Sequence, residues 1–336
     1  HFMGKEMTYR EVFKHARTFA AYLQHLGLEK GDRVAIMLPN CPQSVISYYG
    51  ILLAGGIVVQ TNPLYMEREL SYQMGDSGAK IIVTLDILYP RVMKVKHETN
   101  LEHIIVTAIK EYLPFPKNLI YPFIQKRQYG FSVQVKHEGN QHLFKEILHR
   151  HDLELKEVEI NPDEDLALLQ YTGGTTGFPK GVMLTHKNLV ANAVMCAAWL
   201  YKCKKGEQTV LGFLPFFHVY GMTTVLILSV MQGNKMVLLP KFDLDEALKA
   251  IEKQKPTLFP GAPTMYIGLL NHPDIEKYDL SSIEACLSGS APLPVEVQEK
   301  FEEATGGKLV EGYGLTETSP VTHANFLWDR PPVKGS

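Results

Sequence analysis

LQYTGGTTGFPKGV, residues 169–182, joins an apolar run at 166–171 to a predicted helix that begins near His186. Its glycines let the backbone fold around a ligand with N–H groups pointing inward, and such nests of N–H groups bind anions. The threonine hydroxyls add hydrogen-bond donors, and Lys180 adds a positive charge. These features predict a loop that holds a polyphosphate.

Two other interpretations of this loop are weaker. A Walker A loop needs Gly-Lys-Ser/Thr after its spacer, whereas here Pro179 precedes Lys180 and Gly181 follows it. A flexible surface turn needs one or two glycines, and has no use for three threonines and a lysine.

Length and composition predict a soluble globular protein of two domains. The chain has 336 residues, of which 45% are hydrophobic and 21% charged, enough for two buried cores. The net charge of −2 argues against a nucleic-acid partner. The sequence contains no run of about 18 apolar residues, so it predicts no membrane-spanning helix. The four cysteines form no CxxC motif and predict reduced thiols in the cytoplasm; they are Cys41, Cys196, Cys203 and Cys286.

Apolar runs alternate with helical patterns along most of the chain. Thr8 and Glu11 form a capping-box sequence at the start of the first predicted helix, which runs to about residue 26. Strands are predicted at 34–38, 57–60, 81–84, 103–107, 166–171, 209–214, 236–239, 257–259, 285–287 and 308–310. Further helices are predicted at 44–54, 67–74, 187–200, 220–231, 244–253, 263–270 and 294–304. This alternation predicts an α/β fold whose largely parallel sheets are covered on both faces.

Residues 111–131 interrupt the alternation. Three prolines in this stretch predict that it forms no regular element: Pro114, Pro116 and Pro122. Aromatic residues are interleaved with basic ones, so a membrane-surface patch that gathers fatty acids is one interpretation. An insert packed on the domain is the favoured one. Residues 132–163 are polar and predict a connector to the next strand.

A second motif, VEGYGLTETS at residues 310–319, makes the polyphosphate interpretation specific. In this order and spacing, the two motifs resemble those of the AMP-forming acyl-CoA synthetases in the adenylate-forming superfamily. Within it the chain looks most like the bacterial long-chain fatty acid–CoA ligases. The resemblance runs essentially from end to end.

The resemblance implies an N-terminal region of two stacked αβα subdomains, at about 45–200 and at 1–44 plus 205–325. It also implies that residues 1–336 are truncated: His1 resembles an interior position, and the C-terminal domain would follow Ser336. The family's ribose-binding aspartate, hinge and C-terminal lysine would lie there. The chain alone is therefore expected to bind nucleotide weakly and to turn over little.

The implied reaction has two steps. The carboxylate of a fatty acid attacks the α-phosphate of ATP, which releases pyrophosphate and leaves an acyl-adenylate. The thiol of coenzyme A then attacks the acyl carbon and releases AMP. The first step brings an anion against a polyanion, so it needs fixed positive charge, N–H donors and Mg²⁺.

The resemblance assigns the β- and γ-phosphates to the loop. The residues expected to bind them are Thr172, Gly173, Gly174, Thr175, Thr176, Gly177 and Lys180. Glu317 in the second motif is expected to bind Mg²⁺ with Thr172 nearby, because a carboxylate is a hard oxygen ligand. Outside this motif, an exposed glutamate would be the simpler interpretation. The predicted catalytic residues are His218, Thr172, Glu317 and Lys180.

The resemblance also assigns the rest of the nucleotide site. Tyr313 is expected to stack on adenine because Gly312 and Gly314 leave its face clear; a core tyrosine at a strand end is the alternative. Thr316 would contact the α-phosphate, and Glu311 would lie along the nucleotide. The turn SGSAP at 288–292 would line the adenine through Gly289, Ser290 and Ala291. The usual form of this turn has a second glycine where this chain has Ser290.

The acyl and thiol substrates are assigned in the same way. His218 lies in LPFFHVYG at 214–221 and is expected to position the acyl carboxylate, although an isolated histidine in an apolar run is usually a core residue. Tyr220, Gly221 and Thr224 would line the acyl tunnel, with Gly221 leaving room for the chain. Lys241 would lie near the phosphates of coenzyme A.

Other functions stay open at this point. Within the class, the acid could be short, medium or aromatic, or the chain could load a carrier protein. A non-catalytic nucleotide-binding homologue could dispense with Glu317 and His218. A kinase or ATPase would release ADP instead of AMP. Homodimer formation and peripheral contact of this cytoplasmic protein with the inner face of the membrane also stay open.

Overall fold

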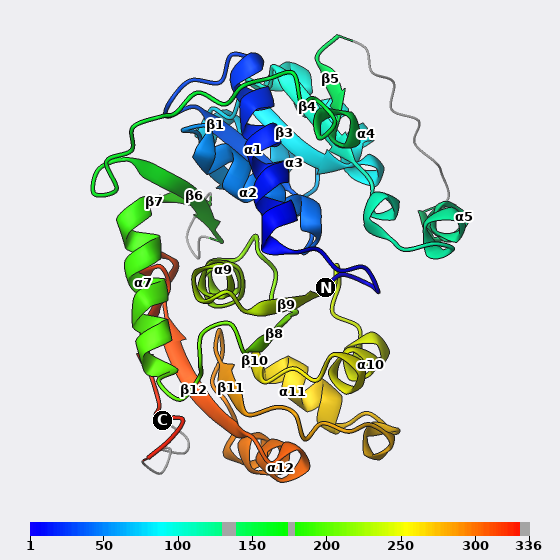
Figure 1. The fold of residues 1–336 in the computed structure, drawn as a ribbon, viewed down its shortest axis with the longest axis vertical. Helices are drawn as coiled ribbons and strands as arrows, with labels where there is room; N and C mark the ends of the chain where they lie inside the picture. Colours follow the sequence, from blue (N-terminus) through cyan, green and yellow to red (C-terminus); the bar gives the residue numbers. More distant parts are fainter. Residues whose placement is uncertain (130–138, 174–178, 330–336) are drawn as a thin grey trace. The chain divides into compact units, whose positions relative to one another are not determined.

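The computed structural model describes residues 1–129, 139–173 and 179–329, and the chain forms two compact units (Figure 1). The N-terminal unit consists of residues 2–186, and the C-terminal unit of His1 and the residues from 187 onward. His1 belongs to the second unit because its ammonium donates to the carbonyl of Met236 at 2.7 Å, and its carbonyl accepts from the N–H of Leu238 at 2.9 Å.

A seven-stranded sheet organises the N-terminal unit. Its strands are β1 (Arg33–Met37), β2 (Ile57–Gln60), β3 (Ile81–Leu85), β4 (His103–Thr107), β5 (Gln141–Leu143), β6 (Leu166–Thr172) and β7 (Lys180–Thr185). Their order is β5-β4-β3-β1-β2-β6-β7, and all neighbours are parallel except β6 and β7. β1 to β4 are almost entirely buried, because a parallel sheet is covered on both faces.

This sheet corrects the predicted subdomains. β1 lies between β3 and β2 in the same sheet, so residues 2–44 belong to the same unit as the residues that follow them, and only His1 belongs with 205–325. The boundary falls at His186. Sequence periodicity could not find it, because backbone pairing between strands decides which segments share a sheet.

Helices connect the strands of the N-terminal unit. They are α1 (Tyr9–His25), α2 (Pro42–Leu53), α3 (Glu67–Ser77), α4 (Tyr89–Val95), α5 (Lys117–Tyr129) and α6 (Phe144–Ile147), with 3-10 turns η1 (Asp86–Leu88), η2 (Lys96–Glu98) and η3 (Ile109–Tyr112). The predicted capping box is present: the Thr8 hydroxyl accepts from the N–H of Glu11 at 3.2 Å, and the Glu11 carboxylate accepts from the N–H of Thr8 at 2.7 Å. Each such cap contributes about 1 kcal/mol.

The prediction that residues 111–131 form no regular element is wrong. Pro114 and Pro116 precede α5, and their carbonyls accept from the N–H groups of Asn118 and Leu119 in its first turn. Pro122 lies within the helix, and its missing N–H removes one intrahelical hydrogen bond. The prediction of a connector at 132–163 was also incomplete, because this range contains β5 and α6.

A six-stranded sheet organises the C-terminal unit. Its strands are β8 (Thr209–Gly212), β9 (Lys235–Leu238), β10 (Leu258–Gly261), β11 (Ala285–Ser288), β12 (Lys308–Gly314) and β13 (Val321–Ala324). Their order is β13-β12-β11-β10-β8-β9, and only β12 and β13 pair antiparallel. The expected α/β fold with largely parallel sheets is thus confirmed in both units.

The helices of the C-terminal unit complete its core. They are α7 (His186–Trp199, whose first residue belongs to the other unit), α8 (Val219–Gly221), the π-helical η4 (Met222–Ile227), α9 (Leu228–Gln232), α10 (Leu244–Gln254), α11 (Pro263–Leu270), η5 (Ile275–Lys277), α12 (Val295–Thr305) and η6 (Thr316–Thr318). The apolar faces of α10, α11 and α12 form a buried cluster with β8 to β12, centred on Phe259, Tyr266 and Phe301. No helix in the described ranges is both long and apolar enough to span a bilayer.

Candidate functional site

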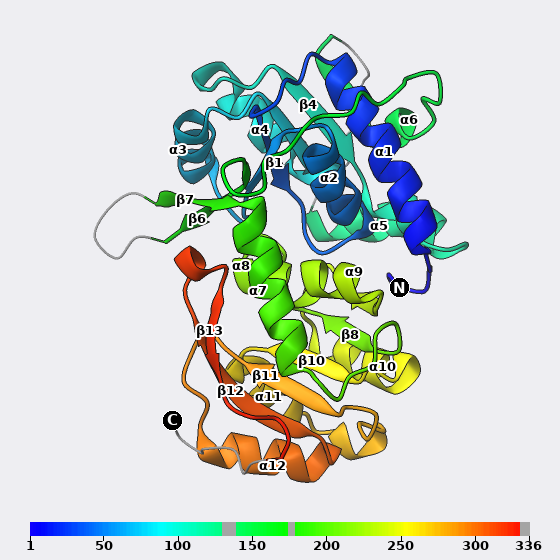
Figure 2. The ribbon, with the colours of Figure 1, turned by 60° about the vertical axis from the view of Figure 1, so that its left-hand side comes forward.

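The described residues of the glycine-rich motif lie on and beside two paired strands, β6 and β7, of the N-terminal unit. The helix α7 begins at His186, as predicted, but the strand β7 before it was not predicted. β6 and β7 pair along their length (Figure 2). Thr172, the last residue of β6, is opposite Lys180, the first residue of β7, at the end of the hairpin where the chain connects the two strands. Directly opposed residues of an antiparallel pair lie on the same face of the sheet, so the structure brings these two predicted catalytic residues together. The Lys180 side chain is exposed, with no hydrogen-bond or ion-pair partner among the described residues.

α3 anchors both strands of this hairpin. The Tyr171 hydroxyl donates to the Asp76 carboxylate at 2.6 Å, and the Tyr72 hydroxyl donates to the carbonyl of Pro179 at 3.0 Å. Burial, and then Asp76, raise the pKa of Tyr171, so its hydroxyl stays protonated. Sequence analysis missed Tyr72 and Asp76, although both are polar residues in the helix that follows β2.

Of the remaining loop residues, the structure describes Gly173 but not residues 174–177. Gly173 is exposed, and beyond its chain neighbours no atom of the described residues lies within 4 Å of the position that a Cβ would occupy there. Gly174, Thr175, Thr176 and Gly177 lie outside the described residues, so their assignment to the phosphates stays a prediction.

The predicted site residues of the C-terminal unit gather at one edge of its sheet. The chain proceeds from β8 to β9 on one side and then to β10 on the other side of β8, so β8 and β10 flank a topological switch point. Ligands of open α/β sheets bind outside the carboxyl ends of the strands at such a point. His218 follows β8, Lys241 follows β9, and Gly289 to Ala291 follow β11 at this edge.

β12 continues past the end of β11 and carries the second motif along this edge. Ser288, the last residue of β11, pairs with Glu311, so residues 312–314 extend beyond β11. The Tyr313 side chain is 61% exposed, which leaves its ring accessible for stacking on a base.

The glycines beside Tyr313 have a packing role that the sequence did not indicate. A Cβ on Gly314 would lie 2.3 Å from the carbonyl oxygen of Pro320, and one on Gly312 would lie 2.9 Å from the Leu287 side chain. These glycines let the strand approach its neighbours closely. Only the accessibility of the Tyr313 ring therefore supports stacking.

Glu311 holds the turn that follows β11. Its carboxylate accepts from the N–H of Leu293 at 3.0 Å, so this side chain braces the 288–292 turn from within the unit. In that turn Gly289 is buried and its N–H donates to the carbonyl of Gly261 at 3.1 Å, while Ser290 and Ala291 are exposed. Ser290 has a φ of +72°, in the left-handed region that glycine favours, which explains the glycine in the usual form of this turn.

Glu317 lies in η6, directly after Thr316, in the connection between β12 and β13. Its carboxylate is exposed and makes no hydrogen bond or ion pair within the described part of the chain. An unpaired carboxylate with both oxygens available fits the hard oxygen ligands that Mg²⁺ prefers. Thr172, its predicted partner, belongs to the other unit, and this pairing stays a prediction.

Two buried residues that sequence analysis missed hold this connection in place. The Asn192 amide on α7 donates to the carbonyls of Thr318 at 3.3 Å and Val321 at 2.8 Å, and its oxygen accepts from the N–H of Val321 at 3.2 Å. The Thr223 hydroxyl in η4 donates to the carbonyl of Ser319 at 2.8 Å. Figure 2 shows the β12–β13 hairpin alongside α7. An asparagine between the apolar residues Leu189 and Ala193 was the signal available in the sequence.

Asn192→Ala is expected to lower the free energy of unfolding of the C-terminal unit by about 1–3 kcal/mol, because it leaves buried carbonyl and N–H groups without partners. Urea denaturation followed by circular dichroism measures this loss. Asn271→Ala is the matched control, since the Asn271 side chain is exposed. If the two variants are equally stable, Asn192 does not brace the connection.

The local structure fixes the protonation state of His218. Its Nδ1 accepts from the backbone N–H of Tyr220 at 3.2 Å and caps α8. The side chain is exposed, but the surrounding protein still desolvates it enough to lower the pKa of the imidazole. The ring is therefore neutral at pH 7 with its proton on Nε2. This N–H can donate to an anionic oxygen, which fits positioning of a carboxylate.

Tyr220 and Gly221 were expected to line an acyl tunnel, but both pack against this chain's own backbone. The Tyr220 hydroxyl donates to the carbonyl of Leu287 at 2.6 Å, so this residue braces β11 from a buried position. A Cβ on Gly221 would lie 2.6 Å from the carbonyl oxygens of both Leu214 and Pro215. The space beside Gly221 is thus filled by this chain's own backbone and is not room for an acyl chain.

A largely apolar cavity of about 500 Å³ lies within the C-terminal unit. Its volume falls within the range of small-molecule sites, about 300–1,000 Å³. It is bounded by α7, by the helical segment from η4 to α9, by β8, β10, β11 and β13, and by one residue after β13. Its lining residues are Met195, Cys196, Ala198, Trp199, Leu200, Val210, Thr224, Leu228, Leu258, Pro260, Ala285, Cys286, Leu287, Val321, Thr322, His323, Ala324 and Leu327.

Three residues of the cavity wall, Thr224, Cys196 and Cys286, have hydroxyl or thiol groups that carry no charge at neutral pH. The hydroxyl of Thr224, a predicted tunnel residue that does line the cavity, donates to the carbonyl of Tyr220 at 2.7 Å. Burial raises the pKa of Cys196 to about 11 and that of Cys286 well above its ordinary value. Both thiols are therefore uncharged at neutral pH, and the wall suits an apolar ligand.

Lys241 lies apart from this cavity wall. It follows β9 in the loop before α10, and its side chain is exposed. Within the ranges that the structure describes it makes no ion pair. Its expected role at the phosphates of coenzyme A stays a prediction.

The sequence profile of the AMP-binding enzyme family matches residues 1–336. A long-chain-fatty-acid–CoA ligase of Bacillus subtilis is 58% identical over 330 residues, which cover 98% of this chain and 59% of that protein. A long-chain-fatty-acid–CoA ligase of Escherichia coli is 38% identical over 328 residues, which cover 96% of this chain and 58% of that protein.

Solved structures are similar as well. An anthranilate–CoA ligase in complex with anthranoyl-AMP matches with a TM-score of 0.84 and 25% identity, over 99% of this chain and 59% of that one. A long-chain-fatty-acid–CoA ligase of Archaeoglobus fulgidus matches with a TM-score of 0.79 and 28% identity, over 95% of this chain and 59% of that one. The chain thus spans somewhat more than half the length of the relatives it matches.

Proposed function

We propose, from the premise that this chain belongs to the AMP-binding enzyme family, that it is the N-terminal region of a long-chain fatty acid–CoA ligase. The reaction joins a fatty acid to coenzyme A and converts ATP to AMP and pyrophosphate through an acyl-adenylate. The long-chain relatives named above are similar over nearly the whole chain. The free thiols in the cavity wall suit a cytoplasmic enzyme.

The observation that carries this proposal is the apolar cavity of about 500 Å³ in the same unit as the Tyr-Gly-Leu-Thr-Glu motif. β11 and β13 contribute to its wall, and β12 between them carries Tyr313. The lining contains His323 but no aspartate, glutamate, lysine or arginine, and most of its side chains are apolar, so the cavity suits an alkyl chain better than a polar acid.

In this proposal the chain's own residues position the reacting groups. The Nε2–H of His218 donates to the fatty acid carboxylate, which is oriented towards the α-phosphate of ATP. Lys180 and the N–H groups of the glycine-rich loop balance the charge of the departing pyrophosphate. The exposed ring of Tyr313 stacks on adenine. The acid oxygen bonds to the α-phosphorus as the bond to pyrophosphate breaks.

The two residues expected at the metal site, Glu317 and Thr172, have the oxygen ligands that Mg²⁺ prefers. Glu317 would bind it through its exposed carboxylate, with the Thr172 hydroxyl as the expected second ligand. The ion would supply positive charge to the phosphate oxygens. Desolvation by the surrounding protein lowers the pKa of His218, so its ring is neutral at pH 7. The Tyr220 N–H occupies Nδ1, so the ring proton stays on Nε2 and can be donated to the acid.

Nucleotide release by the enzyme extended to the full length of its relatives tests the proposal. The assay mixes ATP, Mg²⁺ and coenzyme A with acids from acetate through benzoate to palmitate. AMP and pyrophosphate are expected to form fastest with palmitate. AMP formed only with short or aromatic acids would retain the mechanism and reject the long-chain substrate. ADP, or nucleotide release that is independent of the acid, would reject adenylation.

A further inference from the structure

α5 exposes an apolar face to solvent. Leu119 and Phe123 are four residues apart, as are Ile120 and Ile124, so the two pairs lie in adjacent rows on one side of the helix. Their exposed fractions are 60%, 76%, 51% and 54%, and Phe115 just before the helix is 79% exposed. Contiguous exposed apolar side chains of this kind mark an interaction surface.

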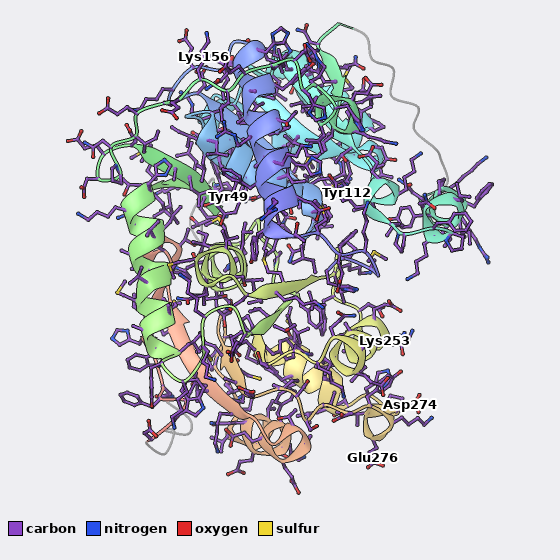
Figure 3. All side chains as sticks on the ribbon, in the orientation of Figure 1. Tyr49, Tyr112, Lys156, Lys253, Asp274 and Glu276 are labelled. Atoms are coloured by element: carbon purple, nitrogen blue, oxygen red, sulfur yellow. The ribbon has the colours of Figure 1, made fainter. Side chains whose placement is uncertain are left out.

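The opposite side of α5 faces its own unit. Asn118, Tyr121, Pro122 and Gln125 are all half-buried, and the Gln125 amide donates to the Asp86 carboxylate at 3.0 Å. α5 packs against η3, where Tyr112 is buried (labelled in Figure 3). The helix therefore turns its more polar side, with Asn118 and Gln125, inward and its more apolar side outward, the reverse of a helix that covers a core.

The charge of α5 has one sign. Residues 115–129 contain Lys117, Lys126 and Arg127 and no acidic residue. All three basic side chains are exposed. The Lys117 ammonium donates to the carbonyl of Met3, an uncharged group, at 3.2 Å. An apolar stripe with basic residues at both ends is the composition of helices that lie in a membrane interface.

We propose that the outward face of α5, formed by Phe115, Leu119, Ile120, Phe123 and Ile124 and flanked by its basic residues, docks onto an anionic lipid bilayer surface. The apolar side chains enter the interface, and the basic side chains remain at the level of the headgroups. The α5 face carries positive charge and no acidic residue. An anionic bilayer therefore suits it better than a second copy of the chain, because two copies would bring like charges together. The proposal is independent of the ligase activity, since membrane docking needs no nucleotide.

Vesicle co-sedimentation of the 336-residue chain tests this surface at low ionic strength. Binding to vesicles that contain phosphatidylglycerol is expected to exceed binding to pure phosphatidylcholine by at least about tenfold, because each basic side chain near an anionic surface contributes about fivefold. L119Q/F123Q is expected to weaken binding to the anionic vesicles by at least about tenfold. K126Q/R127Q is expected to lower the preference for them by a similar factor.

L64Q/M66Q is the matched control. It removes two apolar side chains that are 79% and 58% exposed in the same unit but lie before α3, away from α5 in the sequence. Its binding is expected to equal that of the unmodified chain. Circular dichroism melting of all variants checks folding, and little change is expected because every substituted side chain is exposed.

Two outcomes would overturn the proposal. The first is that the unmodified chain and L119Q/F123Q bind the anionic vesicles equally well, or that neither of them binds. The other is a dimer that light scattering detects in the unmodified chain and that L119Q/F123Q dissociates without any difference in vesicle binding, which would make the face a self-association surface. Neither outcome bears on the release of AMP by the extended enzyme, so failure here and failure of the proposed function are distinguishable.

Discussion

Glu317→Gln is expected to slow acyl-adenylate formation by the extended enzyme by about 10²–10³-fold, the magnitude typical of losing one electrostatic contact to a transition state. Glutamine keeps the size of the side chain and removes its charge, so it is a poorer ligand for Mg²⁺. Because the carboxylate is exposed and has no partner among the described residues, the substitution is expected to leave the fold intact. The loss would therefore be specific to the chemistry.

Palmitate-dependent pyrophosphate release, measured over a range of Mg²⁺ concentrations, provides the measurement. The variant is expected to need more Mg²⁺ for half-maximal rate as well as to be slower. Glu303→Gln on α12 is the matched control, since Glu303 is exposed in the same unit and outside the motif. A Glu317→Gln enzyme with the rate and Mg²⁺ dependence of the Glu303→Gln control would remove Glu317 from the site.

Ala285→Phe is expected to lower kcat/KM for palmitate by about 10²-fold while leaving kcat/KM for acetate nearly unchanged. Ala285 is on β11, is 3% exposed and lines the cavity. A phenyl ring there would occupy volume that a long alkyl chain needs, and each lost methylene contact costs about 1 kcal/mol or more. Ala285 begins β11, at the end of the strand away from the sheet edge where His218 lies, so a short acid held at His218 is not expected to reach it.

Ala304→Phe is the control for this substitution, because Ala304 is exposed on α12. Thermal unfolding of both variants separates overpacking, which typically costs about 1–3 kcal/mol, from blocking of the cavity. Equal losses with acetate and palmitate in a stable Ala285→Phe enzyme would mean that the cavity does not hold the acyl chain.

The strands β1 to β4 could be predicted from the sequence to within about one residue at each end. β2 and β4 begin and end at the predicted residues, because strands covered on both faces are continuous apolar runs. β5, β7 and β13 were missed. They are short or carry exposed residues, and each lies at an edge of its sheet or extends it. Such strands exist because a neighbour offers hydrogen bonds, and their own composition carries little signal.

The candidate site could be predicted only in part. The two motifs sufficed to assign the family, and the match of the family profile confirms that assignment. The opposition of Thr172 and Lys180 depends on the β6–β7 register. The roles of Asn192 and Tyr72 depend on contacts with residues more than a hundred positions away. Single-sequence patterns do not contain such pairings.

Glycine and proline residues show the difference between what the sequence determines and what the tertiary structure decides. The sequence by itself determined the family, the alternation of strands and helices, and the chemistry available in the two motifs, because these depend on residue type and local order. Only the tertiary structure decided that Gly221 and Gly314 admit neighbouring backbone, that Pro122 lies within a helix, and that α5 turns its apolar side outward. Each of these depends on what the fold places beside the residue, since packing and backbone approach are properties of pairs of segments.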